Sequence, residues 1–103
     1  MPDTPNEQAM DPEERLAALR QQLTATPAST IVANHCYGLF ELAGAYLSTA
    51  PPNFEQARVA IDALEGIVGA LPGRLGEDEA NLVDALSKMK QAFVTLQGAS
   101  SES

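Results

Sequence analysis

His35 and Cys36 are the one imidazole and the one thiol of the chain, and they are adjacent. A cysteine paired with a histidine can act as a nucleophile. Successive residues on a helix diverge by about 100°, so these two side chains do not face each other. We therefore predict no catalytic residue here. Cys36 is expected as a small buried apolar side chain, and His35 at the edge of a helix.

Glu41 is a carboxylate among apolar neighbours, and such a group must find a partner, reach water or take up a proton. Arg58 or Arg15 could pair with it. We interpret Glu41 chiefly as a structural residue, such as one that sets the register of a dimer interface, with an exposed position and a functional acid as alternatives. A symmetric dimer could also bring His35 and Glu41 of two chains around a metal. One histidine and one cysteine cannot make a structural zinc site within one chain, and we predict no metal and no cofactor.

The remaining polar motifs also have simple structural interpretations. Asp62 is expected to pair with Arg58 or to face water. The run Glu77 to Glu79 suits the start of a helix, because it lacks the alternating oxygen ligands and the glycine of a calcium loop. The segment 72–76 holds two glycines, but it neither follows a strand nor precedes a Lys-Ser or Lys-Thr pair, which argues against a phosphate site. These patterns favour a non-enzymatic function.

Length and composition limit the number of domains and the kinds of partner that the chain can bind. The chain has 103 residues, which suffices for one domain, and 45% of them are hydrophobic. Six basic residues against 14 acidic ones give a net charge of −8. This balance argues against nucleic acid and against an anionic membrane surface, and it favours a basic partner. The N-terminal residues are polar and acidic rather than basic and then apolar, so we expect no secretory signal and a cytoplasmic protein. Richness in Ala, with Arg used more often than Lys, suggests a bacterial source.

Apolar residues recur at helical spacing, and no strand alternation is present. Asp11 followed by Pro12 and Glu14 predicts a capping box at the first helix. We predict a single domain over 11–97, with disordered tails at 1–10 and 98–103. Its helices are expected at about 11–24, 27–49, 53–71 and 77–97.

The segment 27–49 is apolar almost all round, apart from a stripe of polar or small residues at Asn34, Gly38, Glu41, Ala45 and Ser48. It is too short and too often interrupted for a membrane span. We predict an all-α fold: a small antiparallel bundle of three to four helices with this helix at its centre, completed by dimerisation. The predicted dimer or core face consists of Val32, Cys36, Leu39, Phe40, Tyr46 and Leu47.

A series of apolar, proline, glycine and acidic positions runs from residue 47 to residue 94: Leu47, Pro51, Ala57, Ile61, Asp62, Leu64, Gly73, Leu75, Glu79, Leu82, Leu86, Phe93 and Val94. The order of these features resembles a bacterial family, domain of unknown function 1844. With the preceding helix, the resemblance covers about two thirds of the chain. The chain departs from the family at the turn, where Pro72, Arg74 and Gly76 stand in place of Lys-Thr, Asn and Thr. The resemblance implies a small helical protein and brings no activity and no catalytic residues.

We therefore predict a cytoplasmic homodimeric interaction module that contacts another protein. One alternative is a ligand-binding or enzymatic dimer with a pocket between the chains around His35, Tyr37 and Glu41, the polar groups of the apolar helix. The other is an acidic accessory protein that docks a basic partner.

Overall fold

The computed structural model describes residues 11–102, and this part of the chain is helical without any strand. The elements are α1 (Pro12–Thr24), α2 (Ala28–Leu47), α3 (Phe54–Ala70), the short 3-10 helix η1 (Gly76–Asp78) and α4 (Glu79–Glu102). The predicted all-α class is confirmed, and the four predicted helices are all present. The predicted tail 1–10 lies outside the described residues.

Side chains cap the starts of α1 and α3, whereas α2 follows Pro27 without a side-chain cap. The Asp11 carboxylate accepts a hydrogen bond from the Glu14 backbone N–H at 2.8 Å, and the Glu14 carboxylate accepts one from the Asp11 N–H at 3.3 Å. The predicted capping box is thus present. Asn53 caps α3 in a similar way, because its side-chain oxygen accepts from the Gln56 N–H at 3.2 Å.

The end of α4 differs from the prediction. The helix continues through Gly98 to Glu102, where the sequence predicts a disordered tail from residue 98. A single glycine costs a helix only about 1 kcal/mol relative to alanine. The preceding turns of α4 are anchored by Met89 and Phe93, which are buried in the core, so this cost does not stop the helix.

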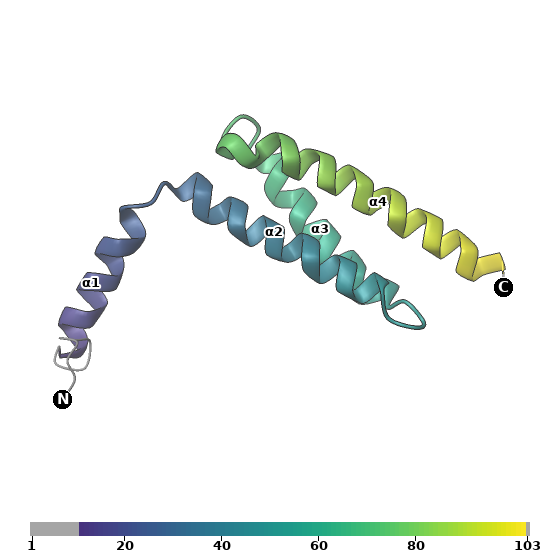
Figure 1. The fold of residues 1–103 in the computed structure, drawn as a ribbon, viewed down its shortest axis with the longest axis horizontal. Coiled ribbons are helices and arrows are strands. Elements are labelled where there is room, and N and C mark those ends of the chain that lie inside the picture. The colour runs from purple at the N-terminus through teal and green to yellow at the C-terminus, as the bar shows by residue number, and fades with distance from the viewer. Residues whose placement is uncertain (1–10, 103) are drawn as a thin grey trace.

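Three helices, α2, α3 and α4, pack together and form the bundle (Figure 1). Two clusters of buried side chains fill it, and Phe40 and Leu86 pack against both. One cluster contains Ala43, Leu47, Ala57, Ala60, Ile61, Met89 and Phe93; the other contains Ala33, Cys36, Leu64, Leu75 and Leu82. The central helix α2 contacts both of its neighbours, as the sequence predicts.

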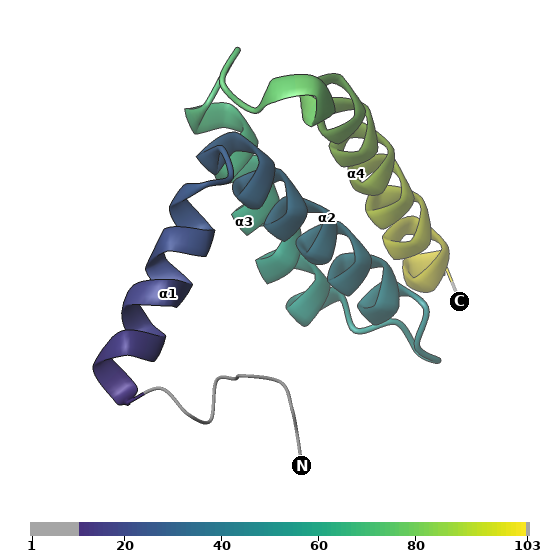
Figure 2. The same ribbon diagram turned by 60° about the vertical axis from the view of Figure 1, so that its left-hand side comes forward.

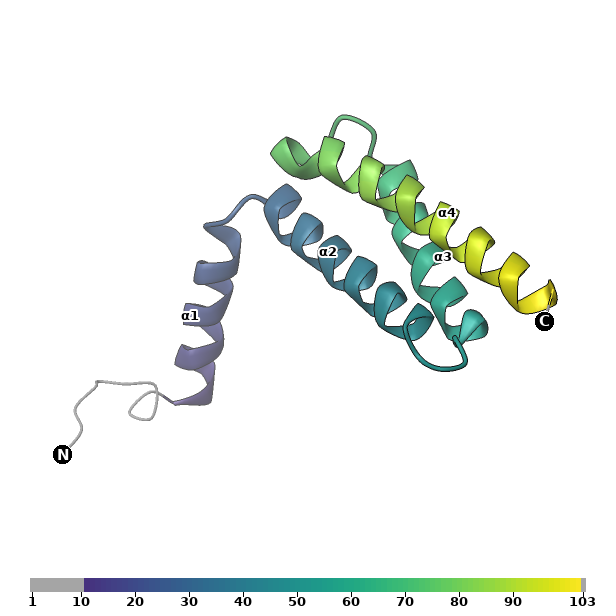
Figure 3. The ribbon, with the colours of Figure 1, turned by 45° about the vertical axis from the view of Figure 1, so that its right-hand side comes forward.

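The first helix stands apart from this bundle. All three ribbon views show α1 projecting from the start of α2 (Figures 1, 2 and 3). None of its residues is buried. The radius of gyration is accordingly 19.1 Å, against about 13 Å for a compact domain of 100 residues. Within one chain the bundle therefore has three helices rather than four.

The turn between α3 and α4 is held by one carboxylate. Glu79 accepts hydrogen bonds from the backbone N–H of Gly73 at 2.7 Å and of Leu75 at 3.0 Å. These bonds lower the pKa of the Glu79 carboxyl. Gly73 and Gly76 both have a φ of +75°, which only glycine adopts without strain. The acidic run therefore supports the helix start, and Glu79 does so by reaching back to the turn.

None of the helices in the range 11–102 combines the length and the apolar character that crossing a membrane requires.

We predict that Leu64→Ala lowers the free energy of unfolding by about 2–5 kcal/mol, because this side chain is fully buried and its removal leaves a cavity. Urea denaturation measures the change. Val94→Ala is the control, since Val94 is 65% exposed, and it should change stability by no more than about 0.5 kcal/mol. Equal effects of the two substitutions would contradict the described core.

We also predict that Glu79→Gln lowers stability at neutral pH, because an amide oxygen replaces a carboxylate that accepts two backbone N–H bonds. The folded-state pKa of Glu79 lies below its unfolded value. Its contribution is therefore present above the unfolded pKa of about 4.3 and is lost as the pH falls through the folded pKa. The stability difference between wild type and variant should shrink over this acidic range. Glu77→Gln, which changes an exposed carboxylate of η1, is the control, and a pH-independent difference for Glu79→Gln would be the contrary result.

Candidate functional site

Tyr37 links α2 to the start of the last helix. Its hydroxyl donates a hydrogen bond to the Asp78 carboxylate, with an oxygen-to-oxygen distance of 2.9 Å. This carboxylate stabilises the protonated phenol, and together with burial it raises the pKa of Tyr37. The side chain is half-buried and its polar atom is satisfied. Tyr37 therefore has a structural role within one chain.

His35 and Glu41 lie elsewhere on the helix surface. His35 is exposed and lines a groove between α2 and α3, on the opposite side of α2 from Tyr37. Glu41 is exposed, one turn beyond Tyr37, and forms no ion pair with any residue of the range 11–100. One chain therefore does not bring the three predicted pocket residues together. A pocket formed between chains stays a prediction.

Arg58 forms no ion pair with Glu41 or Asp62, and Asp62 is exposed, which is the second of the two positions predicted for it. Its guanidinium carbon lies over the Phe93 ring, 5.9 Å from the centroid. Phe93 also makes an edge-to-face contact with Phe54, with centroids 5.4 Å apart. A cation over an aromatic face is attracted by the ring quadrupole, and the arginine stem covers apolar surface as well. The sequence contains no signal for this pair because the two residues lie on different helices.

The residues of the predicted dimer or core face of α2 pack mainly against the core of their own chain. Cys36 and Leu47 are buried, and burial raises the pKa of the Cys36 thiol. A thiol with a raised pKa is a poor nucleophile at neutral pH. Val32, Leu39, Phe40 and Tyr46 are partly buried and pack against the two core clusters. The stripe at Asn34, Gly38, Glu41, Ala45 and Ser48 is exposed, as its sequence pattern indicates.

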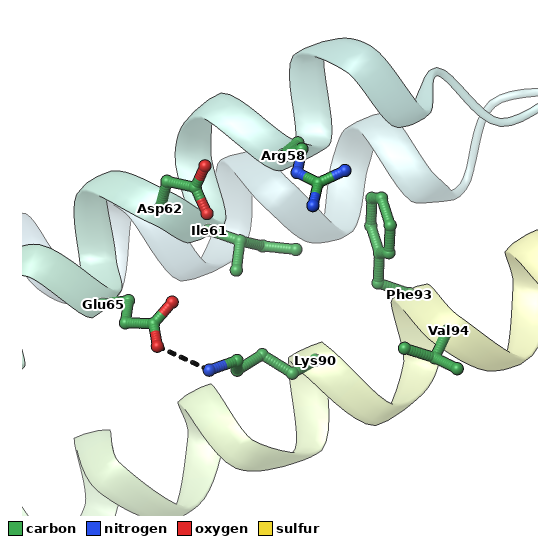
Figure 4. A pocket seen from close by; sticks show the side chains of 7 residues that line it. All are labelled: Arg58, Ile61, Asp62, Glu65, Lys90, Phe93 and Val94. Carbon is green, nitrogen blue, oxygen red and sulfur yellow. Dashed lines mark hydrogen bonds and ion pairs between the residues drawn. The ribbon is translucent and has the colours of Figure 1, made fainter.

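A cleft of about 200 Å³ lies between α3 and α4 (Figure 4). Its lining residues are Arg58, Ile61, Asp62, Glu65, Lys90, Phe93 and Val94. The Lys90 ammonium pairs with the Glu65 carboxylate at 2.6 Å, and Arg58 is directed toward Phe93. Small-molecule sites usually measure about 300–1,000 Å³. The cleft is smaller, and it contains no cysteine, serine or histidine that could act as a nucleophile or base.

The groove between α2 and α3 is more apolar, and residues of α4 do not line it. The lining residues are Val32, His35, Asp62, Ala63, Gly66, Ile67, Ala70 and Leu71. On α3 the small residues Ala63, Gly66 and Ala70 recur at spacings of three and four, so they share one side of the helix. A Cβ atom added at Gly66 would have no atom within 4 Å. The groove is therefore uncovered within the described chain.

A second uncovered apolar surface lies on α1. Leu16, Leu19 and Leu23 form one stripe, and their exposed fractions are 47%, 53% and 54%. Contiguous exposed apolar patches often mark sites of interaction with another protein. No residue of α1 is buried, so the bundle of the same chain does not cover this stripe.

The part of the chain that is described contains no group of three or more His, Cys, Asp or Glu side chains placed to hold a metal ion. The leucine stripe of α1 and the groove between α2 and α3 are two apolar surfaces that the described chain leaves uncovered.

We predict that Asp78→Asn lowers the pKa of Tyr37, because the phenolate is then no longer opposed by a neighbouring carboxylate. Ionisation can be followed by ultraviolet absorbance in a Tyr46→Phe background, so that one tyrosine reports. Asp84→Asn, which alters an exposed acid of the same helix region, should leave the titration of Tyr37 unchanged. An unchanged titration in Asp78→Asn would show that the hydrogen bond does not form in solution.

Comparison of the chain with protein-family models, with curated proteins and with solved structures finds no match. The resemblance to domain of unknown function 1844 is not tested by these comparisons and stays a prediction.

Proposed function

We propose that this chain is a non-enzymatic helical module that forms a homodimer and, as a dimer, contacts another protein. The observation that carries the proposal is the exposed leucine stripe of α1 on a helix that its own bundle does not cover. We assign the protein to the cytoplasm and to the bacterial family that its sequence resembles as parts of the same proposal.

The energetics of α1 support self-association. This helix has 13 residues, and isolated helices shorter than about 12–15 residues are marginal in water. The capping box contributes about 1 kcal/mol, which does not replace tertiary packing. Full burial of an exposed leucine side chain contributes about 1.5–3 kcal/mol, and roughly half of this remains to be gained for each of these half-exposed leucines. A second surface that covers the stripe would therefore stabilise α1 substantially.

The arrangement of polar groups supports an interaction function over catalysis. The one thiol is buried and the one imidazole is exposed on another side of α2. In the cleft between α3 and α4, the Lys90 charge is already paired with Glu65. General acid-base or nucleophilic catalysis needs such groups within hydrogen-bond reach of one another and of a substrate.

The charge of the chain favours a basic protein as the further partner. A net charge of −8 attracts basic surfaces and repels nucleic acid. Acidic residues gather at the start of α4, where Glu77, Glu79 and Asp84 surround the exposed Val83. This surface is separate from the groove between α2 and α3, so a dimer could present it on both chains.

Native mass spectrometry of the untagged chain at micromolar concentration tests the proposal. We expect the mass of two chains and no small molecule. The mass of one chain over the whole concentration range would contradict the proposed homodimer. A dimer that carries a bound metal or small ligand would instead support a pocket between chains around His35 and Glu41.

A further inference from the structure

We propose that α1 of one chain binds in the groove between α2 and α3 of a second copy, so that two chains exchange their first helices. The inference rests on the proposed homodimer and specifies its interface. Each copy would supply one α1 and one groove, and the two contacts would be related by a twofold axis.

The two surfaces match in chemistry. The stripe on α1 consists of Leu16, Leu19 and Leu23, each about half exposed. The groove combines apolar side chains with the small residues Ala63, Gly66 and Ala70. Small residues let another helix approach closely, and branched leucine side chains can then fill the space above them. The groove is thus suited to the leucine stripe of a helix.

The two surfaces also match in length. A 13-residue helix is about 20 Å long. Helical spacing places the exposed Val59 on the same side of α3 as Ala63, and the exposed Leu42 on the same side of α2 as His35. The apolar surface therefore continues past the groove, and Val59 to Ala70 spans about 17 Å along α3. Leu42 and Val59 are 44% and 63% exposed, so a docked helix would cover them as well.

The charges at the edges are complementary. Arg20 lies on the same side of α1 as Leu16 and Leu23, and its guanidinium forms no ion pair with any residue of the range 11–100. Asp62 is the acidic residue that lines the groove, and it forms no ion pair in that range either. Docking would bring these opposite charges to one interface, which favours the correct register.

The connection between α1 and α2 favours a second copy over the chain's own groove. The backbone N–H of Ala25 donates to Gln21 and Gln22, and that of Thr26 donates to Leu23. On the other side, Thr30 and Ile31 donate to the carbonyl of Pro27, at 3.0 and 3.4 Å. These bonds complete the last turn of α1 and the first turn of α2, and α1 points away from its own bundle (Figures 1 and 3). Docking on the same chain requires α1 to swing back about the junction between Thr26 and Pro27, whereas exchange with a second copy keeps the observed direction of the helix.

Exchange of the first helices between two chains gives a closed dimer. Because each chain donates one helix and accepts one, two chains use up both kinds of surface and leave none for a third. The inference therefore predicts a dimer with no tendency to form higher oligomers.

The first test compares Leu19→Glu with Gln21→Glu by sedimentation equilibrium. Leu19 is 53% exposed in its own chain, so its substitution leaves the bundle core intact. Gln21 lies on the opposite side of α1 and receives the same added charge. We expect Leu19→Glu to raise the dimer dissociation constant by at least about tenfold, and Gln21→Glu to leave it near that of wild type. Equal dissociation constants for the two variants would overturn the inference.

The second test fills the groove. A Cβ at Gly66 or at Gly38 would have no atom within 4 Å, so both positions accept a side chain in the free chain. Gly66 lines the groove, and Gly38 lies on the exposed stripe of α2. Gly66→Gln should weaken the dimer, whereas Gly38→Gln should not. Both variants should remain at least as helical as wild type, because glycine is the poorer helix former.

Mixing the two weakened variants identifies the exchange itself. A mixed dimer of Leu19→Glu and Gly66→Gln chains pairs the intact α1 of one with the intact groove of the other. Each variant homodimer has two damaged contacts, whereas the mixed dimer concentrates both substitutions in one contact and keeps the other intact. Once one substitution has broken a contact, the second adds little to the loss, because effects at residues in contact are not additive. The mixed dimer should therefore form more tightly than either variant alone, although less tightly than wild type. A mixture no tighter than its components would overturn the exchange. If wild type is a dimer and neither substitution weakens it, the homodimer is supported but the proposed interface is wrong. If wild type is a monomer, both the homodimer and the interface are wrong.

Discussion

The close approach of α2 to both of its neighbours depends on small side chains at the contacts. Ala33, Cys36 and Ala43 of α2 are completely buried, and Ala57 and Ala60 of α3 face the same core. Small residues shorten the distance between helix axes, so the larger Leu64 and Leu82 can fill the remaining space at interior density. Almost the whole of the described core follows from this packing. A larger side chain at Cys36 or Ala43 would have to displace a neighbouring helix.

This packing also determines what remains uncovered. Because α4 lies over one side of the pair formed by α2 and α3, the other side of that pair stays open as an apolar groove. The first helix continues away from the bundle, and its leucines remain exposed. The chain therefore has a three-helix core with one spare helix and one spare groove, which is the arrangement that exchange between two copies would complete.

Much of the fold is visible in the sequence. Apolar residues that recur at helical spacing predict one buried face on each helix, and Ile61, Leu64, Leu82, Met89 and Phe93 lie in the core at such spacing. The sequence does not reveal how far α2 is covered by its own chain, since periodicity shows which side is apolar and not which helix covers it. For the same reason the contact of Arg58 with Phe93 and the Tyr37 to Asp78 hydrogen bond were not predicted. Gly98 suggested a helix end that the structure does not have, because one glycine is a weak signal against an anchored helix.

Amide hydrogen exchange across α1, measured as a function of protein concentration, tests directly whether a second copy covers this helix. An undocked helix of this length exchanges rapidly, and docking protects it. We expect the α1 amides to become protected as the concentration rises through the dimer dissociation constant, while the amides of the bundle core stay protected throughout. Amide exchange in α1 that does not depend on protein concentration would contradict docking on a second copy, whether α1 is protected by its own chain or is not protected at all.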